Sequence, residues 1–185
     1  AAKLERARRA ADLEGRGLAF GIRLHVIARD TSEEAWAHAD RMLAGLDPGQ
    51  VAAAQAEMRA SQSEGQRRMT SLHGGDPSRL LVAPNLWAGI GLVRAGAGTA
   101  LVGSHEEVAE RIAEYHELGV EEFILSGYPR LEELYRVGEG VLPALARRGL
   151  WREPGAPEDP GGYRAASSDA GVLVPSGAGA GASAP

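Results

Sequence analysis

Two side chains that carry or can accept a positive charge, Arg23 and His25, lie two positions apart in the segment 20–27, where apolar residues alternate with others. A period of two is typical of a β-strand and places Arg23 and His25 on one face, opposite Leu24 and its apolar neighbours. A guanidinium beside an imidazole suits an anionic ligand. The strand alone also allows an edge position with both side chains in solvent.

Two further residues are candidates for the same chemistry. Arg94 lies in a glycine-punctuated segment, and a flexible loop can close over a site and deliver a charge. Tyr128 follows a second strand, predicted over residues 120–125, and active sites of α/β barrels gather at the carboxyl ends of strands. The alternatives are a solvated surface arginine and a tyrosine that packs on Pro129.

Several other chemistries lack the residues that they require. The chain has no cysteine, which excludes thiol catalysis, disulfides and cysteine-ligated zinc. No pair of its five histidines has H-E-x-x-H spacing, so we expect no metal site. No G-x-S-x-G elbow is present. The glycine-rich segment 89–104 fails both nucleotide motifs, because Arg94 replaces the third glycine of one and Ser104 replaces the lysine of the other.

Strands that alternate with helices predict parallel β-α-β units and therefore an α/β fold. Two strands cannot close a barrel, so either strands from an absent N-terminal portion complete the fold or the fragment is not independently stable. The predicted elements, in chain order, are a helix over 2–13, a strand over 20–27, a helix from the capping box Thr31–Glu34 to residues 47–49, a polar helical stretch over 50–68, an irregular loop over 70–98, a short regular stretch over 99–103, a helix from the capping box Ser104–Glu107 to Gly119, a strand over 120–125 and a helix over 131–147.

Composition separates a predicted globular part, residues 1–150, from a predicted disordered tail, residues 151–185, which is rich in Gly, Ala, Pro and Ser. A net charge of −5 argues against a nucleic-acid groove. No apolar run approaches the roughly 18–20 residues that span a bilayer, and no signal peptide is visible. We therefore expect a cytoplasmic protein that binds neither nucleic acid nor membrane.

Several motifs together resemble the alkanesulfonate monooxygenases, a branch of the bacterial luciferase-like flavin monooxygenases. The resemblance covers roughly residues 1–147 and is densest in five segments: F-G-I-R-L-H-V-I at 20–27, L-H-G-G at 72–75, P-N-L-W-A-G at 84–89, G-L-V-R-A-G-A-G-T-A-L-V-G at 91–103 and F-I-L-S-G-Y-P at 123–129.

The resemblance implies an α/β fold that is the C-terminal part of a TIM-type (β/α)8 barrel with an inserted mobile loop. This chain would supply about the last two strands of that barrel. The resemblance also implies reduced FMN as a diffusible co-substrate from a separate NAD(P)H-dependent FMN reductase, oxygen, and a homo-oligomer, a homotetramer in the family. The reaction would convert an alkanesulfonate to an aldehyde and sulfite for sulfur acquisition. Arg23 and His25 would contact the sulfonate and the flavin peroxide, Arg94 would be the arginine of a mobile loop that closes over the flavin, and Tyr128 would be the active-site tyrosine.

Two alternatives stay open at this point. One is a luciferase-like monooxygenase that acts on another small sulfur compound. The other is a truncated, inactive remnant that at most binds a partner half-barrel, suggested by the start at Ala1, the two-strand count and the low-complexity tail.

Overall fold

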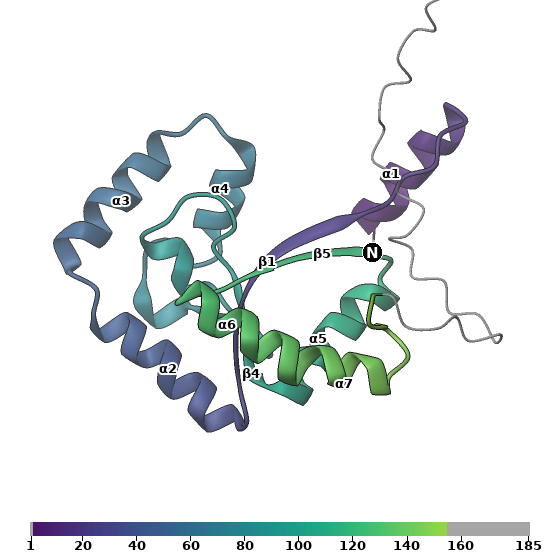
Figure 1. The fold of residues 1–185 in the computed structure, drawn as a ribbon. Coiled ribbons are helices and arrows are strands. Elements are labelled where there is room, and N and C mark those ends of the chain that lie inside the picture. The colour runs from purple at the N-terminus through teal and green to yellow at the C-terminus, as the bar shows by residue number, and fades with distance from the viewer. Residues whose placement is uncertain (1, 155–185) are drawn as a thin grey trace, which may run out of the picture.

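The strand β1 (Gly21–Arg29) lies between β4 and the edge strand β5 in a five-stranded sheet with the order β2-β3-β4-β1-β5 (Figure 1). This is a computed structural model, and it describes residues 2–154. The predicted tail falls almost wholly outside the described residues. The other elements are α1 (Ala2–Leu13), α2 (Ser32–Ala44), α3 (Pro48–Ala60), α4 (Glu64–Ser71), β2 (Leu81–Ala83), β3 (Leu86–Trp87), β4 (Ala100–Ser104), α5 (His105–Glu117), β5 (Glu122–Ser126), α6 (Arg130–Arg136) and α7 (Leu142–Arg147).

The sheet is mixed. Strand β1 pairs in parallel with β4 on one side, with His25 opposite Ala100, and with β5 on the other, with His25 opposite Ser126. The hairpin β2-β3 extends the β4 side in antiparallel fashion. The two predicted strands are confirmed, but β4 and the hairpin were not assigned from the sequence.

The strand order departs from the order that a barrel requires. Consecutive strands are neighbours in a (β/α)8 barrel, so the chain order would give β1-β4-β5, whereas β1 lies between β4 and β5. Five strands are also too few for closure, which takes about eight in barrels of this type. The described residues therefore form an open α/β sheet, and the barrel itself stays a prediction.

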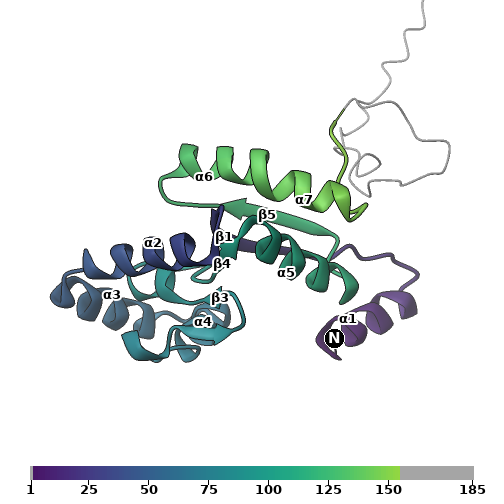
Figure 2. The same ribbon diagram turned by 90° about the horizontal axis from the view of Figure 1, so that it is seen from below.

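Both faces of the sheet are covered by apolar side chains. Leu24, Val26 and Ala28 of β1 share one core with buried residues of α5 and α7. Ile27, on the other face, shares a second core with Ala35 and residues of the 80–92 segment. Figures 1 and 2 show α2, α3 and α4 together on one side of the molecule, away from α1. Among the described residues, α2 and the 80–92 segment therefore pack on the same face of β1 as His25.

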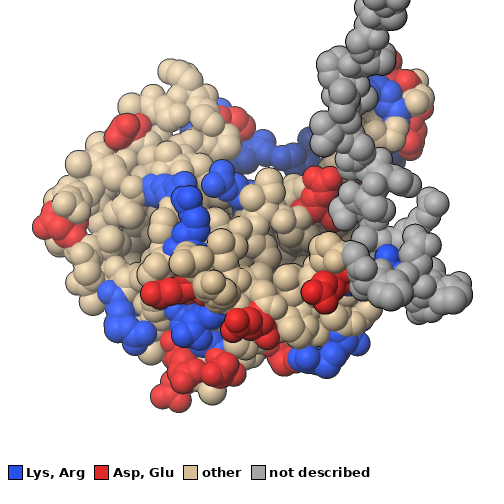
Figure 3. Space-filling model, viewed as in Figure 1, with Lys and Arg blue, Asp and Glu red and all other residues tan. Residues whose placement is uncertain are grey.

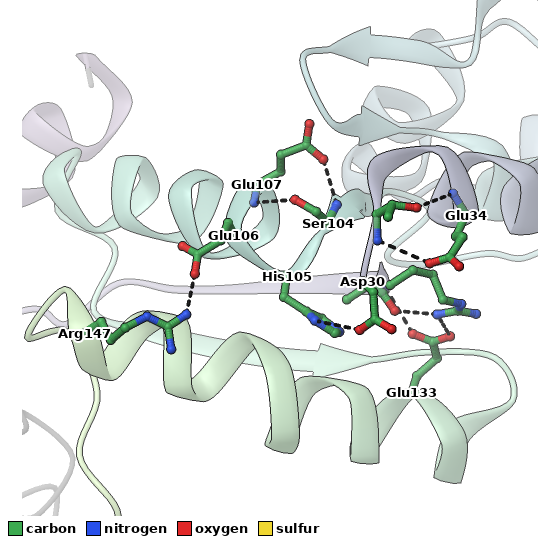
Figure 4. Close-up of polar contacts among 11 residues, drawn as sticks. Asp30, Glu34, Ser104, His105, Glu106, Glu107, Glu133 and Arg147 are labelled. Carbon is green, nitrogen blue, oxygen red and sulfur yellow. Dashed lines mark hydrogen bonds and ion pairs between the residues drawn. The ribbon is translucent and has the colours of Figure 1, made fainter.

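Helix starts follow the predicted capping signals. In both capping boxes the side chains of Thr31 and Ser104 accept the backbone N–H of the glutamate three residues later, and Glu34 and Glu107 accept in return (Figure 4). These exchanges satisfy N–H groups that the first helical turn leaves unpaired. Helix α2 ends at Ala44 with Gly45 as its C-cap, before the predicted stop at residues 47–49. Those residues instead begin the next helix, because Asp47 caps α3 and Pro48 is its first residue.

Residues 70–98 are more ordered than the predicted irregular loop. They contain β2, β3 and two short 3-10 turns, η1 (Pro77–Arg79) and η2 (Gly89–Leu92), and every residue of η2 is buried. The predicted last helix is continuous in outline, but a π turn, η3 (Val137–Val141), joins α6 to α7 at its two glycines. Within residues 2–154, no helix has both the length and the apolar content needed to cross a bilayer.

A buried ion pair ties the end of β1 to α6. The Nη1 atom of Arg29 lies 2.6 Å from Oε1 of Glu133, whose side chain is only 1% exposed (Figure 4). The other carboxylate oxygen of Glu133 accepts the backbone N–H of Ala28 at 3.4 Å. Glu133 therefore fixes α6 against the carboxyl end of β1.

Candidate active site

His25 lies at the centre of the candidate site and is 2% exposed. Its Nε2 lies 3.1 Å from the carbonyl oxygen of Ala97, which can only accept, so Nε2 carries the proton. Its Nδ1 is then free to accept the hydroxyl proton of Ser126 at 3.0 Å. Both ring nitrogens are satisfied by a neutral imidazole, which fixes the tautomer and the orientation of the ring.

Tyr128 and Arg94 complete a cluster around this imidazole. The rings of His25 and Tyr128 stack with centroids 5.4 Å apart and an interplanar angle of 27°. The guanidinium carbon of Arg94 lies 5.5 Å from the centroid of the Tyr128 ring, within cation–π range. The backbone carbonyl of Tyr128 accepts from Nε2 of His38 on α2 at 3.4 Å. Three of the four predicted site residues therefore meet, although 34 to 103 positions separate them pairwise along the chain.

Arg23 lies at the exposed end of the same strand. Its side chain faces solvent, as the edge-strand alternative predicts for it, whereas His25 is buried. Arg23 nonetheless acts on the cluster electrostatically. Burial lowers the pKa of His25 below its ordinary value, and the positive charges of Arg94 and Arg23 lower that pKa further. Within residues 2–154, neither arginine has a carboxylate partner. The site therefore holds two uncompensated positive charges beside a neutral imidazole.

An apolar cavity of about 390 Å³ opens beside Tyr128 and Arg94. Its walls come from α2, through Met42, Leu43 and Leu46, and from Trp87, Gly89, Ile90 and Val93. This volume lies within the range of small-molecule sites, which combine apolar walls with a few fixed polar groups. On the face shown in Figure 3, several basic side chains lie together near the centre, and basic and acidic side chains alternate along the lower edge.

Close backbone approach explains the glycines around Arg94. The N–H of Gly91 donates to the carbonyl of Gly98 at 3.0 Å, and a Cβ on Gly98 would lie 2.7 Å from the Cα of Gly91. A Cβ on Gly89 would overlap the ring of Trp87 at 1.9 Å. These glycines serve the packing of the segment against β3 and against itself, which agrees with the rejection of a phosphate-binding motif.

Sequence reasoning missed three contributors to the site. Ser126 is in register with His25 on the neighbouring strand. Its position just after the second predicted strand, two residues before Tyr128, could have indicated that it belongs to the site. Trp87 provides an aromatic wall of the cavity. Gln55 supports the Arg94 segment from α3, with no distinguishing signal in the polar stretch 50–68. As for metals, no group of three or more His, Cys, Asp or Glu able to hold an ion occurs in the described part of the chain.

Comparison with known families bears directly on this cluster. The family model described as luciferase-like monooxygenase matches residues 1–122, which is well over half of the chain. The chain belongs to the luciferase-like monooxygenase family. The match includes β1 with Arg23 and His25 and the segment that carries Arg94, whereas Tyr128 lies beyond the matched residues. The predicted membership in a family of flavin-dependent monooxygenases is therefore confirmed.

A solved structure supports the fold. The chain is similar to a riboflavin lyase, RcaE, crystallised with modified FMN and its substrate riboflavin, with a TM-score of 0.53 and 24% sequence identity. The similarity covers 78% of this chain and 35% of the lyase chain. The described sheet and helices of this luciferase-like chain thus correspond to about a third of a flavin enzyme of known structure.

Proposed function

We propose that this chain contributes the anion-binding side of the active site of a flavin-dependent alkanesulfonate monooxygenase. The observation that carries the proposal is the presence of two guanidinium groups near the neutral His25, Arg94 beside Tyr128 and Arg23 two residues earlier on β1. Neither has a carboxylate partner among residues 2–154. A sulfonate is a permanent anion, and guanidinium groups bind such oxyanions through charge-assisted hydrogen bonds. Because the lowered pKa keeps the His25 imidazole neutral near pH 7, the positive charge of the site comes from the two arginines.

The residues present suit a flavin. The cavity beside Tyr128 has apolar walls and an indole, which match a flat, largely apolar ring system, and Arg94 at its rim matches an anionic group. When bound, reduced FMN would supply the electrons with which one atom of dioxygen is added to the sulfonate-bearing carbon, so that the C–S bond breaks to give an aldehyde and sulfite. Trp87 and Tyr128 would hold the ring system, and Arg94 would bind at its edge.

The chain's own residues would orient and shield the reacting groups. His25 donates to the carbonyl of Ala97 and thereby anchors the segment that carries Arg94. Its stack with Tyr128 orients the phenol ring beside the cavity. The Arg94 segment, which lines the cavity, would limit the access of water to it. This matters where a reactive oxygenating species must not be hydrolysed. A separate NAD(P)H-dependent reductase would deliver the reduced FMN in the cytoplasm, and the working enzyme would be a homo-oligomer.

The alternatives differ in substrate or in activity. A luciferase-like monooxygenase that acts on another small sulfur compound would use the same flavin cavity but would not require Arg23, whereas an inactive remnant would bind neither flavin nor sulfonate. The test is sulfite release by the full-length protein with FMN, a flavin reductase and NADH, on alkanesulfonates and, in parallel, on uncharged sulfones and sulfides. The proposal predicts turnover of sulfonates that Arg23→Gln reduces on the order of 10- to 100-fold in kcat/KM, the scale of one charge-assisted contact. Preference for uncharged sulfur compounds would overturn the sulfonate assignment.

A further inference from the structure

Two buried glutamines hold the segment that carries Arg94, one on each side of it. The amide nitrogen of Gln55, on α3, lies 2.9 Å from the carbonyl of Gly91 and 2.8 Å from that of Leu92. The side-chain oxygen of Gln66, on α4, accepts the backbone N–H of Gly96 at 2.9 Å. Gln55 is 2% exposed and Gln66 is 7% exposed, which is unusual for glutamine.

The segment needs such support because little packs on its outer side. A second cavity of about 770 Å³ lies between α3, α4 and residues 93–97, and Val93 and Arg94 line both this cavity and the one beside Tyr128. Residues 93 and 94 therefore separate the two cavities. Val93 is 40% exposed, so few neighbours hold this segment in place. A shift toward the larger cavity would withdraw the Arg94 guanidinium from Tyr128.

We propose that Gln55 and Gln66 are positioning residues, which hold Arg94 over Tyr128 by bonding the backbone just before and just after it. This proposal rests on the proposed role of Arg94 in ligand binding. The two glutamines play opposite chemical parts. Gln55 must donate, because its partners are two carbonyl oxygens, and Gln66 must accept, because its partner is an N–H group.

This difference gives a matched pair of substitutions. Gln55→Glu keeps the size of the side chain but places a carboxylate, which only accepts, against the carbonyls of Gly91 and Leu92. Gln66→Glu keeps an acceptor for the N–H of Gly96, and the hydroxyl of Thr70, which now accepts from Gln66 at 3.3 Å, can donate instead. A Gln→Glu substitution at position 55 should therefore loosen residues 91–97, whereas the same substitution at position 66 should leave them in place.

The experiment measures amide hydrogen exchange of residues 91–97 and the pKa of His25 by NMR in the full-length protein. For Gln55→Glu we expect exchange at least about tenfold faster, a change in opening free energy of about 1.4 kcal/mol. We also expect an upward shift of the His25 pKa, because Arg94 moves away. Gln55→Met, which removes the donor without adding charge, should shift the pKa in the same direction. Gln66→Glu, and the exposed control Gln50→Glu on α3, should stay within about twofold of wild type in exchange.

A double-variant cycle separates positioning from a general structural effect. In an Arg94→Gln background, Gln55→Met should raise the His25 pKa no further, because the charge that it displaces is already absent. Equal loosening by Gln55→Glu and Gln66→Glu, or a further pKa rise in the Arg94→Gln background, would overturn the proposal. Neither readout uses flavin or turnover. If Arg94→Gln also leaves FMN and octanesulfonate affinity unchanged, the role of Arg94 in ligand binding fails, while exchange and pKa still decide whether the glutamines position it.

Discussion

The guanidinium carbon of Arg94 lies 5.5 Å from the centroid of the Tyr128 ring, although the two residues come from separate segments on either side of β4 and α5. The same ring stacks on His25, whose Nε2 donates to Ala97 in the Arg94 segment. His25 thus contacts Tyr128, Tyr128 contacts Arg94, and the segment that carries Arg94 is bonded back to His25 through Ala97. A change at one member should therefore be detectable at the others.

Removing the charge of Arg94 should raise the pKa of His25. Burial lowers that pKa first, and the nearby guanidinium of Arg94 lowers it further, so Arg94→Gln removes only the second cause. The expected result is an upward shift in an NMR titration of the His25 ring, with the pKa still held down by burial. Arg79→Gln, an exposed arginine away from the site, is the matched control. An unchanged His25 pKa in Arg94→Gln would mean that the two groups do not interact.

The protein should lose stability as the pH falls below about 6.5, the ordinary pKa of histidine. Burial lowers the pKa of both His25 and His73 in the folded state. The unfolded chain then binds more protons than the folded one in this window, so the free energy of unfolding rises with pH. The contribution is complete above about pH 6.5 and is lost as the pH falls toward the lowered folded-state values.

Urea titrations at about pH 7.5 and pH 5.5 measure this effect, with an upper limit of about 1.4 kcal/mol per pH unit for each histidine. His73 is fully buried, and its Nδ1 accepts the backbone N–H of Gly75 at 2.9 Å, so it must be neutral to keep that bond. His73→Gln should therefore flatten the pH dependence. Equal stability of wild type at both pH values would contradict the account.

Glu133→Ala should destabilise the fold strongly. The substitution leaves the Arg29 guanidinium, whose side chain is 9% exposed, without its carboxylate partner. Breaking one half of a buried pair typically costs about 3–5 kcal/mol. The exposed neighbour Glu132→Ala should change the free energy of unfolding by less than about 0.5 kcal/mol in the same urea titration. Similar values for the two variants would show that the pair is not buried as described.

Local signals in the sequence predicted the elements well where capping and alternation were strong. The capping boxes at Thr31 and Ser104 and the strand around His25 were read directly, because these patterns depend on neighbouring residues. Strand β4 was not assigned, because four of its five residues are buried and the strand shows no alternation of apolar and polar residues. The strand order could not be predicted either, because strand pairing depends on contacts between segments that are distant in the sequence.

The candidate site divides in the same way. His25 and Tyr128 were predicted from their places on or after strands, and Arg94 from its glycine-rich surroundings. The supporting contacts of Gln55 and Ser126 were not, because hydrogen bonds across 36 and 101 residues leave no mark in the local sequence. Arg23 was expected inside a barrel, but its side chain is exposed on the open sheet.

Gly98→Ala should disturb the Arg94 segment. A Cβ at this position would lie 2.7 Å from the Cα of Gly91, a backbone atom that cannot rotate away. Overpacking of this kind costs about 1–3 kcal/mol, and here it would also displace Arg94 from Tyr128. Gly65→Ala on α4 meets only ordinary contact at 3.7 Å and should be neutral or slightly stabilising. Thermal unfolding of both variants decides this, and an unaffected Gly98→Ala would show that the segment can yield.

The most direct test of the proposed function is the amount of sulfite released for each reduced FMN oxidised by the full-length protein in the presence of an alkanesulfonate. If Arg23 and Arg94 bind the sulfonate beside the flavin, the ratio should approach one sulfite per flavin, and Arg94→Ala should abolish sulfite release. The thermal unfolding curve should change little, because the cation–π contact of Arg94 with Tyr128 is only partly buried and contributes about 1 kcal/mol. Oxidation of FMN without sulfite in wild type, or an undiminished ratio in Arg94→Ala, would contradict the account.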